Sequence, residues 1–283
     1  MPKEFKQGVY ILKANGTREL FLRDKLLGSL TCAGAEREVA EKIVHHIEGE
    51  IEDGMSSERI YNHAFELLHK FERPSALRYS LRRAIAELGP SGFPFEKFFA
   101  ELMKHRGFET ATNQIVQGHC TDHEIDVVAW NDQKLIMAEA KFHNQFGLKS
   151  DVKVALYVKS RFDDLHSEEF NYGRRRKVDD FWLVTNTKFT EKAIQYAECA
   201  GVRLIGWNYP REANLHHMIE DEGLHPLTSL TTLSVGEKRT LMERGVVLCK
   251  SVRDNAGILE SIGLKGDAVS RVVSESNELC PLE

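Results

Sequence analysis

The chain changes its pattern of apolar and polar positions twice, and these changes divide it into three segments. In the first segment, residues 8–21 (GVYILKANGTRELF) predict two short strands joined by an Asn-Gly turn, which is typical of a β-hairpin. Apolar residues then recur every three or four positions and predict helices at residues 37–51, 56–71 and 74–88. We expect Ser56 or Ser57 to cap the second of these helices, and Pro74 to stand near the start of the third.

A boundary follows at residues 88–94 (LGPSGFP), where two prolines and two glycines stand within seven residues. An amphipathic helix is expected next, over residues 95–109 (FEKFFAELMKHRGFE), ending at Gly107. Two apolar runs on either side of Asn131-Asp132-Gln133 predict a second hairpin. The rest of this segment predicts a helix at 150–165, a strand at 179–189, a helix at 190–201 capped by Thr190, and a strand at 202–208.

A strand, a helix and a strand at this spacing form a βαβ unit, which implies a partly parallel sheet with helices on its faces. From about residue 226 onward the pattern is helical, at residues 234–245 and 255–279. The sequence therefore predicts a mixed α/β protein of three domains: residues 1–90, residues 91–222 and a small helical module at residues 223–283.

The composition is that of a globular protein, with 42% hydrophobic residues among 283. No run of about 18 apolar residues predicts a membrane span, and the N-terminal residues lack the apolar core of a secretory signal. The five cysteines are scattered, without a Cys-x-x-Cys pair. Such usage is typical of the reducing cytoplasm, where we expect the protein to reside, and it predicts no zinc site.

The formal net charge of −5 excludes a globally basic nucleic-acid binder, so any contact with phosphate has to come from a local cluster. One such cluster is Arg174-Arg175-Arg176-Lys177. A solvated loop and a nucleic-acid contact are both open interpretations of it.

The second hairpin carries the charged residues of most interest. Glu139 and Lys141 are two positions apart in a strand, so both side chains leave the same face. A solvated ion pair would explain them, but their apolar neighbours favour a cleft. If the helix bearing Glu96 packs beside the hairpin, Glu96, Asp126 and Glu139 converge next to Lys141. Carboxylates in this number suit Mg²⁺, and a lysine beside them offsets charge at a phosphate, so the pattern favours phosphodiester hydrolysis.

Asp126, Glu139-Ala140-Lys141 and the helical Phe95-Glu96-Lys97-Phe98 together resemble the PD-(D/E)xK nuclease superfamily, in its Mrr-like restriction endonuclease branch. The resemblance covers roughly residues 93–210. It implies that Asp126 and Glu139 bind Mg²⁺ or Mn²⁺, that Lys141 is the catalytic lysine, and that Glu96 is the supporting acid of the helix. Many Mrr-like members carry glutamine where Glu139 stands, and Ile125 replaces the proline of the usual Pro-Asp dipeptide. His143 is two residues beyond Lys141 and is therefore expected on the same face, where it would contact substrate phosphate; a partly exposed residue at the strand end is the alternative.

The first segment resembles an ATP-cone, a small regulatory domain of ribonucleotide reductases and of their repressor, over residues 9 to about 86. The resemblance implies five nucleotide contacts for ATP or dATP: Lys13, Glu19, Lys25, Ser57 and Tyr61. Two lysines near a helix N-terminus would make an anion site, whereas ordinary surface charge is the alternative. Ala14 and Asn15 replace the more usual Arg-Asp pair. The chain lacks the length for a reductase barrel and the Cys-x-x-Cys pairs of the repressor's zinc ribbon.

Near the C-terminus, ILESIGLKGDAVSRVV is similar to a helix-hairpin-helix element with Gly263 and Gly266 at its turn, and a packing or dimerisation module is the alternative. Taken together, the segments predict a cytoplasmic, Mg²⁺-dependent DNA endonuclease that responds to ATP or dATP. The alternative is a nucleotide-gated nucleic-acid-binding regulator without cleavage activity. The expected partners are DNA and ATP or dATP, with no membrane, and a homo-oligomer is expected because ATP-cones often mediate contacts between chains.

Overall fold

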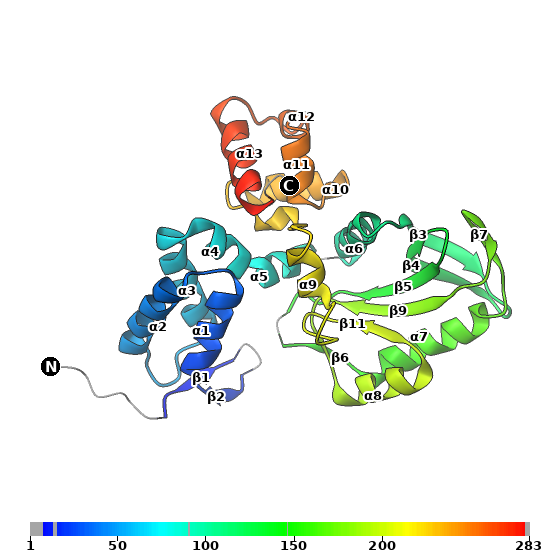
Figure 1. Ribbon diagram of the computed structural model, residues 1–283, viewed down its shortest axis with the longest axis horizontal. Helices are drawn as coiled ribbons and strands as arrows, with labels where there is room; N and C mark the ends of the chain where they lie inside the picture. The colour runs from blue at the N-terminus through cyan, green and yellow to red at the C-terminus, as the bar shows by residue number, and fades with distance from the viewer. Residues whose placement is uncertain (1–7, 14–15, 90, 146, 281–283) are drawn as a thin grey trace. The chain divides into compact units, whose positions relative to one another are not determined.

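The computed structural model describes residues 8–13, 16–89, 91–145 and 147–280, and the chain divides into two compact units, Met1–Arg83 and Ala84–Glu283 (Figure 1). Each unit has its own buried apolar core. The boundaries of the three domains expected from the sequence stay predictions.

The N-terminal unit combines a small hairpin with a group of helices. Strand β1 (Tyr10–Leu12) pairs antiparallel with β2 (Arg18–Leu20), although Ala14 and Asn15, between them, lie outside the described residues. The hairpin is followed by the helices α1 (Arg23–Cys32), α2 (Arg37–Glu50), α3 (Ser57–Phe71) and α4 (Arg73–Tyr79). Ser56 is the N-cap of α3, because its side chain accepts a hydrogen bond from the Arg59 N–H at 3.1 Å.

The prediction of a single helix at residues 74–88 is wrong. Pro74 does stand in the first turn of α4, but the helix ends at Tyr79 with Ser80 as its C-cap, and a separate helix, α5 (Leu81–Ala86), follows. The Ser80 hydroxyl donates to the Leu77 carbonyl at 2.7 Å. A serine that bonds to the backbone in this way competes with helix continuation, which the apolar period of the sequence does not register.

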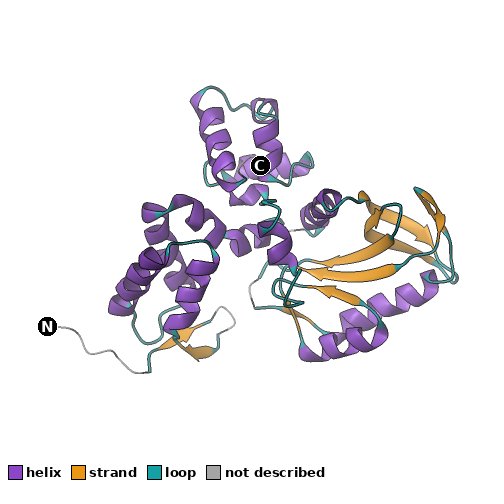
Figure 2. Ribbon diagram, viewed as in Figure 1, coloured by secondary structure: helices purple, strands orange, loops and turns teal. Residues whose placement is uncertain are grey.

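The second unit is built on a five-stranded mixed sheet in the order β11-β9-β5-β4-β3, and its strands are drawn in orange in Figure 2. The strands are β3 (Glu109–Gln117), β4 (Asp122–Trp130), β5 (Leu135–Lys141), β9 (Asp180–Thr185) and β11 (Arg203–Ile205). Strands β3, β4 and β5 are antiparallel, whereas β5, β9 and β11 are parallel. The mixed α/β character and the partly parallel sheet expected from the sequence are confirmed.

Helices cover both faces of this sheet (Figure 1). Helix α6 (Phe93–His105) lies on one face, where its Phe99 ring contacts Trp182 at a centroid distance of 6.3 Å. Helices α7 (Val152–Leu165) and α8 (Glu191–Ala200) lie on the other face, and the core there includes Val158 and Ala193. Thr190 caps α8, as expected, by accepting from the Ala193 N–H at 3.2 Å.

Two smaller strand pairs complete this part of the unit. Strand β6 (Lys149–Ser150) pairs parallel with β10 (Lys188–Phe189). Strand β7 (Phe170–Tyr172) pairs antiparallel with β8 (Arg174–Arg176), so the three arginines of the basic cluster lie in a strand and only Lys177 follows it outside the strand. Gly173, at φ +69°, makes the tight turn between β7 and β8 possible.

The C-terminal part of the second unit is helical. It contains α9 (Leu215–Glu220), the 3₁₀ helix η1 (Leu227–Ser229), α10 (Val235–Glu243), α11 (Cys249–Asp254), α12 (Gly257–Glu260) and α13 (Asp267–Leu279). The fully buried carboxylate of Glu275 accepts from the backbone N–H groups of Thr231 and Thr232, both at 2.8 Å. This part contacts the C-terminal end of α6. Arg106, the C-cap of that helix, pairs with Glu222 at 2.8 Å, and Lys250 Nζ lies 3.2 Å from His105 Nε2. Among the described helices, none has both the length and the apolar character to cross a membrane.

Candidate active site

Strands β4 and β5 separate from one another in the middle of the sheet, and the candidate site lies at this fork. Their backbone pairing runs from Trp130–Leu135 to Val127–Ala138. Beyond that pair, β4 stays paired with β3 and β5 stays paired with β9. Ala140, which follows Glu139 in β5, donates its N–H to the Asp126 carboxylate at 2.7 Å instead of to a β4 carbonyl. The site is therefore at a split between inner strands rather than on an edge strand.

The fork brings together the four residues proposed for catalysis. Asp126 and Glu139 are each one step beyond the last β4–β5 pair, and partners across an antiparallel pair point to one face. Lys141 is two residues further along β5, and Glu96 stands in the first turn of α6. Glu96, Asp126 and Glu139 interact electrostatically with one another, and Lys141 interacts with both strand carboxylates.

Burial and mutual repulsion make these carboxylates hard to ionise. Burial, followed by the negative charges of Asp126, Glu124 and Glu139, raises the pKa of Glu96 to about 7. Burial also raises the pKa of Asp126, although the Ala140 N–H opposes this effect. The pKa of Glu139 is raised by burial first and by Asp126 second. A site that concentrates poorly solvated carboxylates in this way favours a bound cation.

Arg161 on α7 is the site residue that the sequence did not reveal. Its guanidinium is buried and donates to the Glu139 carboxylate, and it also lies over the Tyr157 ring, 5.1 Å from the centroid. The positive charge lowers the pKa of Glu139 and so opposes part of the burial effect. No local motif marks Arg161, because it meets Glu139 only when α7 packs onto the sheet.

His143 lies two residues past the end of β5. Strand β5 ends at Lys141, so side-chain alternation does not continue to His143. Its N–H donates to Asn186 Oδ1 at 2.8 Å, and its ring Nε2 lies 3.2 Å from the hydroxyl of buried Ser150. These contacts hold the partly buried histidine, and its pKa is lowered by burial first and by the charge of Lys141 second.

The donor set at the fork fits Mg²⁺ or Mn²⁺. Asp126 and Glu139 supply oxygen ligands, as these ions prefer, and the remaining positions suit water and phosphate. Among the described residues, Glu96, Asp126 and Glu139 do not form a preassembled cluster of three ligand atoms within 4.8 Å. A two-carboxylate site completed by water and substrate is the arrangement that fits the geometry.

In the N-terminal unit, three of the five proposed nucleotide contacts meet at the hairpin. Lys13 lies 3.3 Å from the Glu19 carboxylate, and Lys25 donates to the same carboxylate. Lys25 first, and then Lys13, lower the pKa of Glu19. The Leu12 N–H donates to the Met55 carbonyl at 3.0 Å, which brings the end of β1 next to the start of α3.

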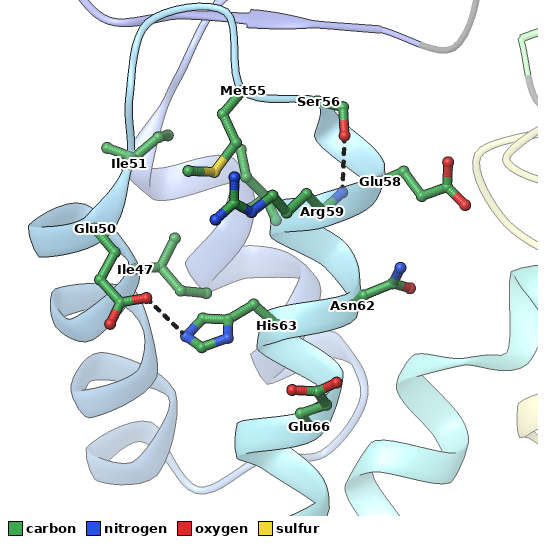
Figure 3. Close-up of a pocket in the computed structure, with 11 residues that line it drawn as sticks. Ile47, Glu50, Ile51, Met55, Ser56, Glu58, Arg59, Asn62, His63 and Glu66 are labelled. Carbon is green, nitrogen blue, oxygen red and sulfur yellow. Dashed lines mark hydrogen bonds and ion pairs between the residues drawn. The ribbon is translucent and has the colours of Figure 1, made fainter.

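The other two proposed contacts lie on α3. Ser57 is its first residue, and Tyr61 is one turn further along, where its ring stacks on Tyr79 at 5.0 Å. A cavity of about 500 Å³ opens between α2 and α3 (Figure 3), and its lining contains none of Lys13, Glu19, Lys25, Ser57 and Tyr61, all of which the structure describes.

Comparison with known proteins identifies two regions of the chain. Residues 89–208 match the model of the Mrr-type restriction endonuclease family, and residues 225–280 match the model described as AF1548-like, C-terminal. An uncharacterized protein of Archaeoglobus fulgidus is 38% identical over 182 residues, which are 64% of this chain and 98% of that protein. The chain belongs to the AF1548-like family.

A solved structure extends this relationship to three dimensions. The crystal structure of AF1548, a protein of unknown function, aligns with a TM-score of 0.56 and 34% identity, over 67% of this chain and 98% of that one. Can2 of Sulfobacillus thermosulfidooxidans, solved with cyclic tetra-adenylate, aligns at a TM-score of 0.33 and 16% identity, over 44% of this chain and 34% of that one. The latter likeness is too slight to carry an argument.

The family model matched by residues 89–208 describes the central region. That region contains a restriction endonuclease-like domain, as expected from Asp126, Glu139 and Lys141. The family models name no ATP-cone, so nucleotide binding by the N-terminal unit stays a prediction, and so do the roles of the individual site residues.

Proposed function

We propose that this protein is a divalent-metal-dependent endodeoxyribonuclease whose reaction takes place at the fork between β4 and β5. The observation that carries the proposal is the meeting of Asp126 and Glu139 where the strands part, with Lys141 on the same face and Glu96 from α6. The restriction endonuclease family match over residues 89–208 supports the same reaction class.

The roles follow from the chemistry of each side chain. Asp126 and Glu139 would hold Mg²⁺ or Mn²⁺, which supplies charge neutralisation for a phosphodiester under attack by water. The exposed ammonium of Lys141 would lie beside the scissile phosphate and stabilise the charge that develops on it. Glu96, with its pKa near 7, is suited to accept a proton from water close to neutral pH.

Substrate binding would rely on local positive charge, because the chain as a whole is acidic. The β7–β8 hairpin offers Arg174 and Arg175, both exposed, and Arg175 pairs with Glu169 at 2.8 Å. Arg176 instead donates to the Tyr172 carbonyl at 3.2 Å, within the hairpin. Arg174 and Arg175 are therefore the proposed contacts with DNA phosphates.

We also propose that the N-terminal unit binds ATP or dATP and regulates cleavage. Lys13 and Lys25 both interact with the carboxylate of Glu19, next to the start of α3. This arrangement supports an anion site, because a helix N-terminus favours negative charge. A homo-oligomer that responds to the nucleotide remains part of this proposal.

The experiment that tests the nuclease proposal is cleavage of plasmid and single-stranded DNA with Mg²⁺ or Mn²⁺. Asp126→Asn and Lys141→Met should each lower the rate on the order of 100-fold or more. The exposed residues Asp122 and Lys149 provide matched controls, because Asp122→Asn and Lys149→Met remove the same charges and should leave the rate unchanged.

The alternative function is a nucleic-acid-binding regulator without cleavage activity. It predicts DNA binding without product in any divalent metal, and no calorimetric difference in Mg²⁺ binding between the wild type and Asp126→Asn. Those two results together would replace the nuclease proposal.

A further inference from the structure

A second group of metal-ligating side chains lies in the N-terminal unit. His46 and Glu50 are one turn apart on α2, and His63 stands opposite them on α3. Their ligand atoms all lie within 4.8 Å of one another. In the part of the chain that the structure describes, this is the one cluster of three or more His, Cys, Asp or Glu ligands with that spacing.

The distances within the cluster suit a common ion. His46 Nε2 lies 3.3 Å from one Glu50 oxygen, and His63 Nε2 lies 3.2 Å from the other. Two ligands that are each about 2.05 Å from a tetrahedral zinc ion lie about 3.3 Å apart. The imidazole rings of His46 and His63 are near-parallel, with an interplanar angle of 23° and 5.2 Å between centroids, and both present Nε2 to the carboxylate.

The cluster also borders the cavity between α2 and α3. Glu50 and His63 belong to its lining, and Figure 3 shows both side chains on the cavity wall. The charged side chains of the described lining are three carboxylates and one guanidinium, those of Glu50, Glu58, Glu66 and Arg59. Their net negative charge favours a cation there.

The two helices that carry the ligands are packed against each other. Ile47 of α2 and Ile60 of α3 line the same cavity and are buried in the core of the unit. A ligand set supported by packed helices requires little rearrangement to bind an ion.

We propose that His46, Glu50 and His63 form a binding site for Zn²⁺ or a similar divalent transition metal, with one coordination position open to the cavity. Two histidines and a carboxylate are a ligand set of zinc, and three protein ligands leave the fourth position for water or an anion. The site is separate from the oxygen-ligand site at Asp126 and Glu139, and it does not depend on the nuclease proposal.

Calorimetric titration of Zn²⁺ into the full chain, with excess Mg²⁺ present, tests the proposal. We expect one Zn²⁺ per chain, with at least about tenfold weaker binding in His46→Gln, His63→Gln and Glu50→Gln. His45→Gln is the matched control, because His45 is an exposed neighbour on α2 outside the cluster, and its affinity should equal that of the wild type.

Co²⁺ gives a second readout, since a tetrahedral site of this kind produces intense visible absorption that the cluster variants should lose. Asp126→Asn should keep both Zn²⁺ binding and the Co²⁺ spectrum. Absence of Zn²⁺ binding, equal binding in a His46→Gln/His63→Gln double variant, or its loss in Asp126→Asn would each overturn the site. Circular dichroism in EDTA establishes that every variant is folded.

Discussion

Arg161 on α7 donates a hydrogen bond from its buried guanidinium to the carboxylate of Glu139 on β5. The contact joins a helix on one face of the sheet to a proposed metal ligand at the fork. It places a positive charge where a divalent cation would otherwise neutralise Glu139.

Arg161→Met should destabilise the metal-free protein, because Glu139 is left half-buried without its partner. We expect a loss of about 2–3 kcal/mol in the free energy of unfolding in EDTA. Mg²⁺ should restore part of that loss and raise the melting temperature of the variant more than that of the wild type. The Glu139→Gln/Arg161→Met double variant is the control, since it has no carboxylate to stabilise. An equal response to Mg²⁺ in all three proteins would contradict the arrangement.

Glu96 makes stability depend on pH in a definite direction. Its folded-state pKa of about 7 lies above the ordinary value of 4.5, so the folded protein holds a proton that the unfolded chain releases between these values. Stability contributed by this group is present below pH 4.5 and is lost as the pH rises through 7. Glu96→Gln should therefore melt a few degrees above the wild type at pH 8 and together with it at pH 4.5, without divalent metal. A constant difference across this range would argue against the raised pKa.

The basic hairpin should contribute affinity without sequence preference. Each phosphate contact that is lost lowers the dependence of DNA binding on salt, so Arg174→Ala/Arg175→Ala should reduce the slope of log K against log salt by up to about 2. Fluorescence anisotropy at several salt concentrations measures this slope. Lys192→Ala removes an exposed charge from α8 and should leave the slope unchanged. Equal slopes for all three proteins would remove the hairpin from the DNA interface.

Nucleotide binding should depend on the two lysines that share Glu19. Lys13→Ala and Lys25→Ala should each weaken ATP or dATP binding about tenfold, because each removes a positive charge from the proposed triphosphate site. Calorimetry measures the affinity. Lys42→Ala is the matched control, since Lys42 pairs with Glu38 on α2 at 2.8 Å and should not affect binding. Undetectable nucleotide binding by the wild type would end the proposal of regulation by ATP or dATP.

Local sequence rules located most elements because their signals are short-range. The hydrogen bonds of the N-caps Ser56 and Thr190 join residues three positions apart, so spacing along the chain is sufficient to predict them. The split of the helix at Ser80 was missed, because a serine hydroxyl bond to the preceding turn leaves no trace in the apolar period.

The sequence by itself determined which strand Glu139 and Lys141 share and that both leave one face, since alternation along a strand is a property of local backbone geometry. Only the tertiary structure decided that β4 and β5 part at Asp126, that Arg161 reaches Glu139, and that His63 faces His46 and Glu50 across two helices. These relationships join residues 13 to 22 positions apart through packing of strands and helices, and packing depends on the whole apolar core rather than on any local pattern.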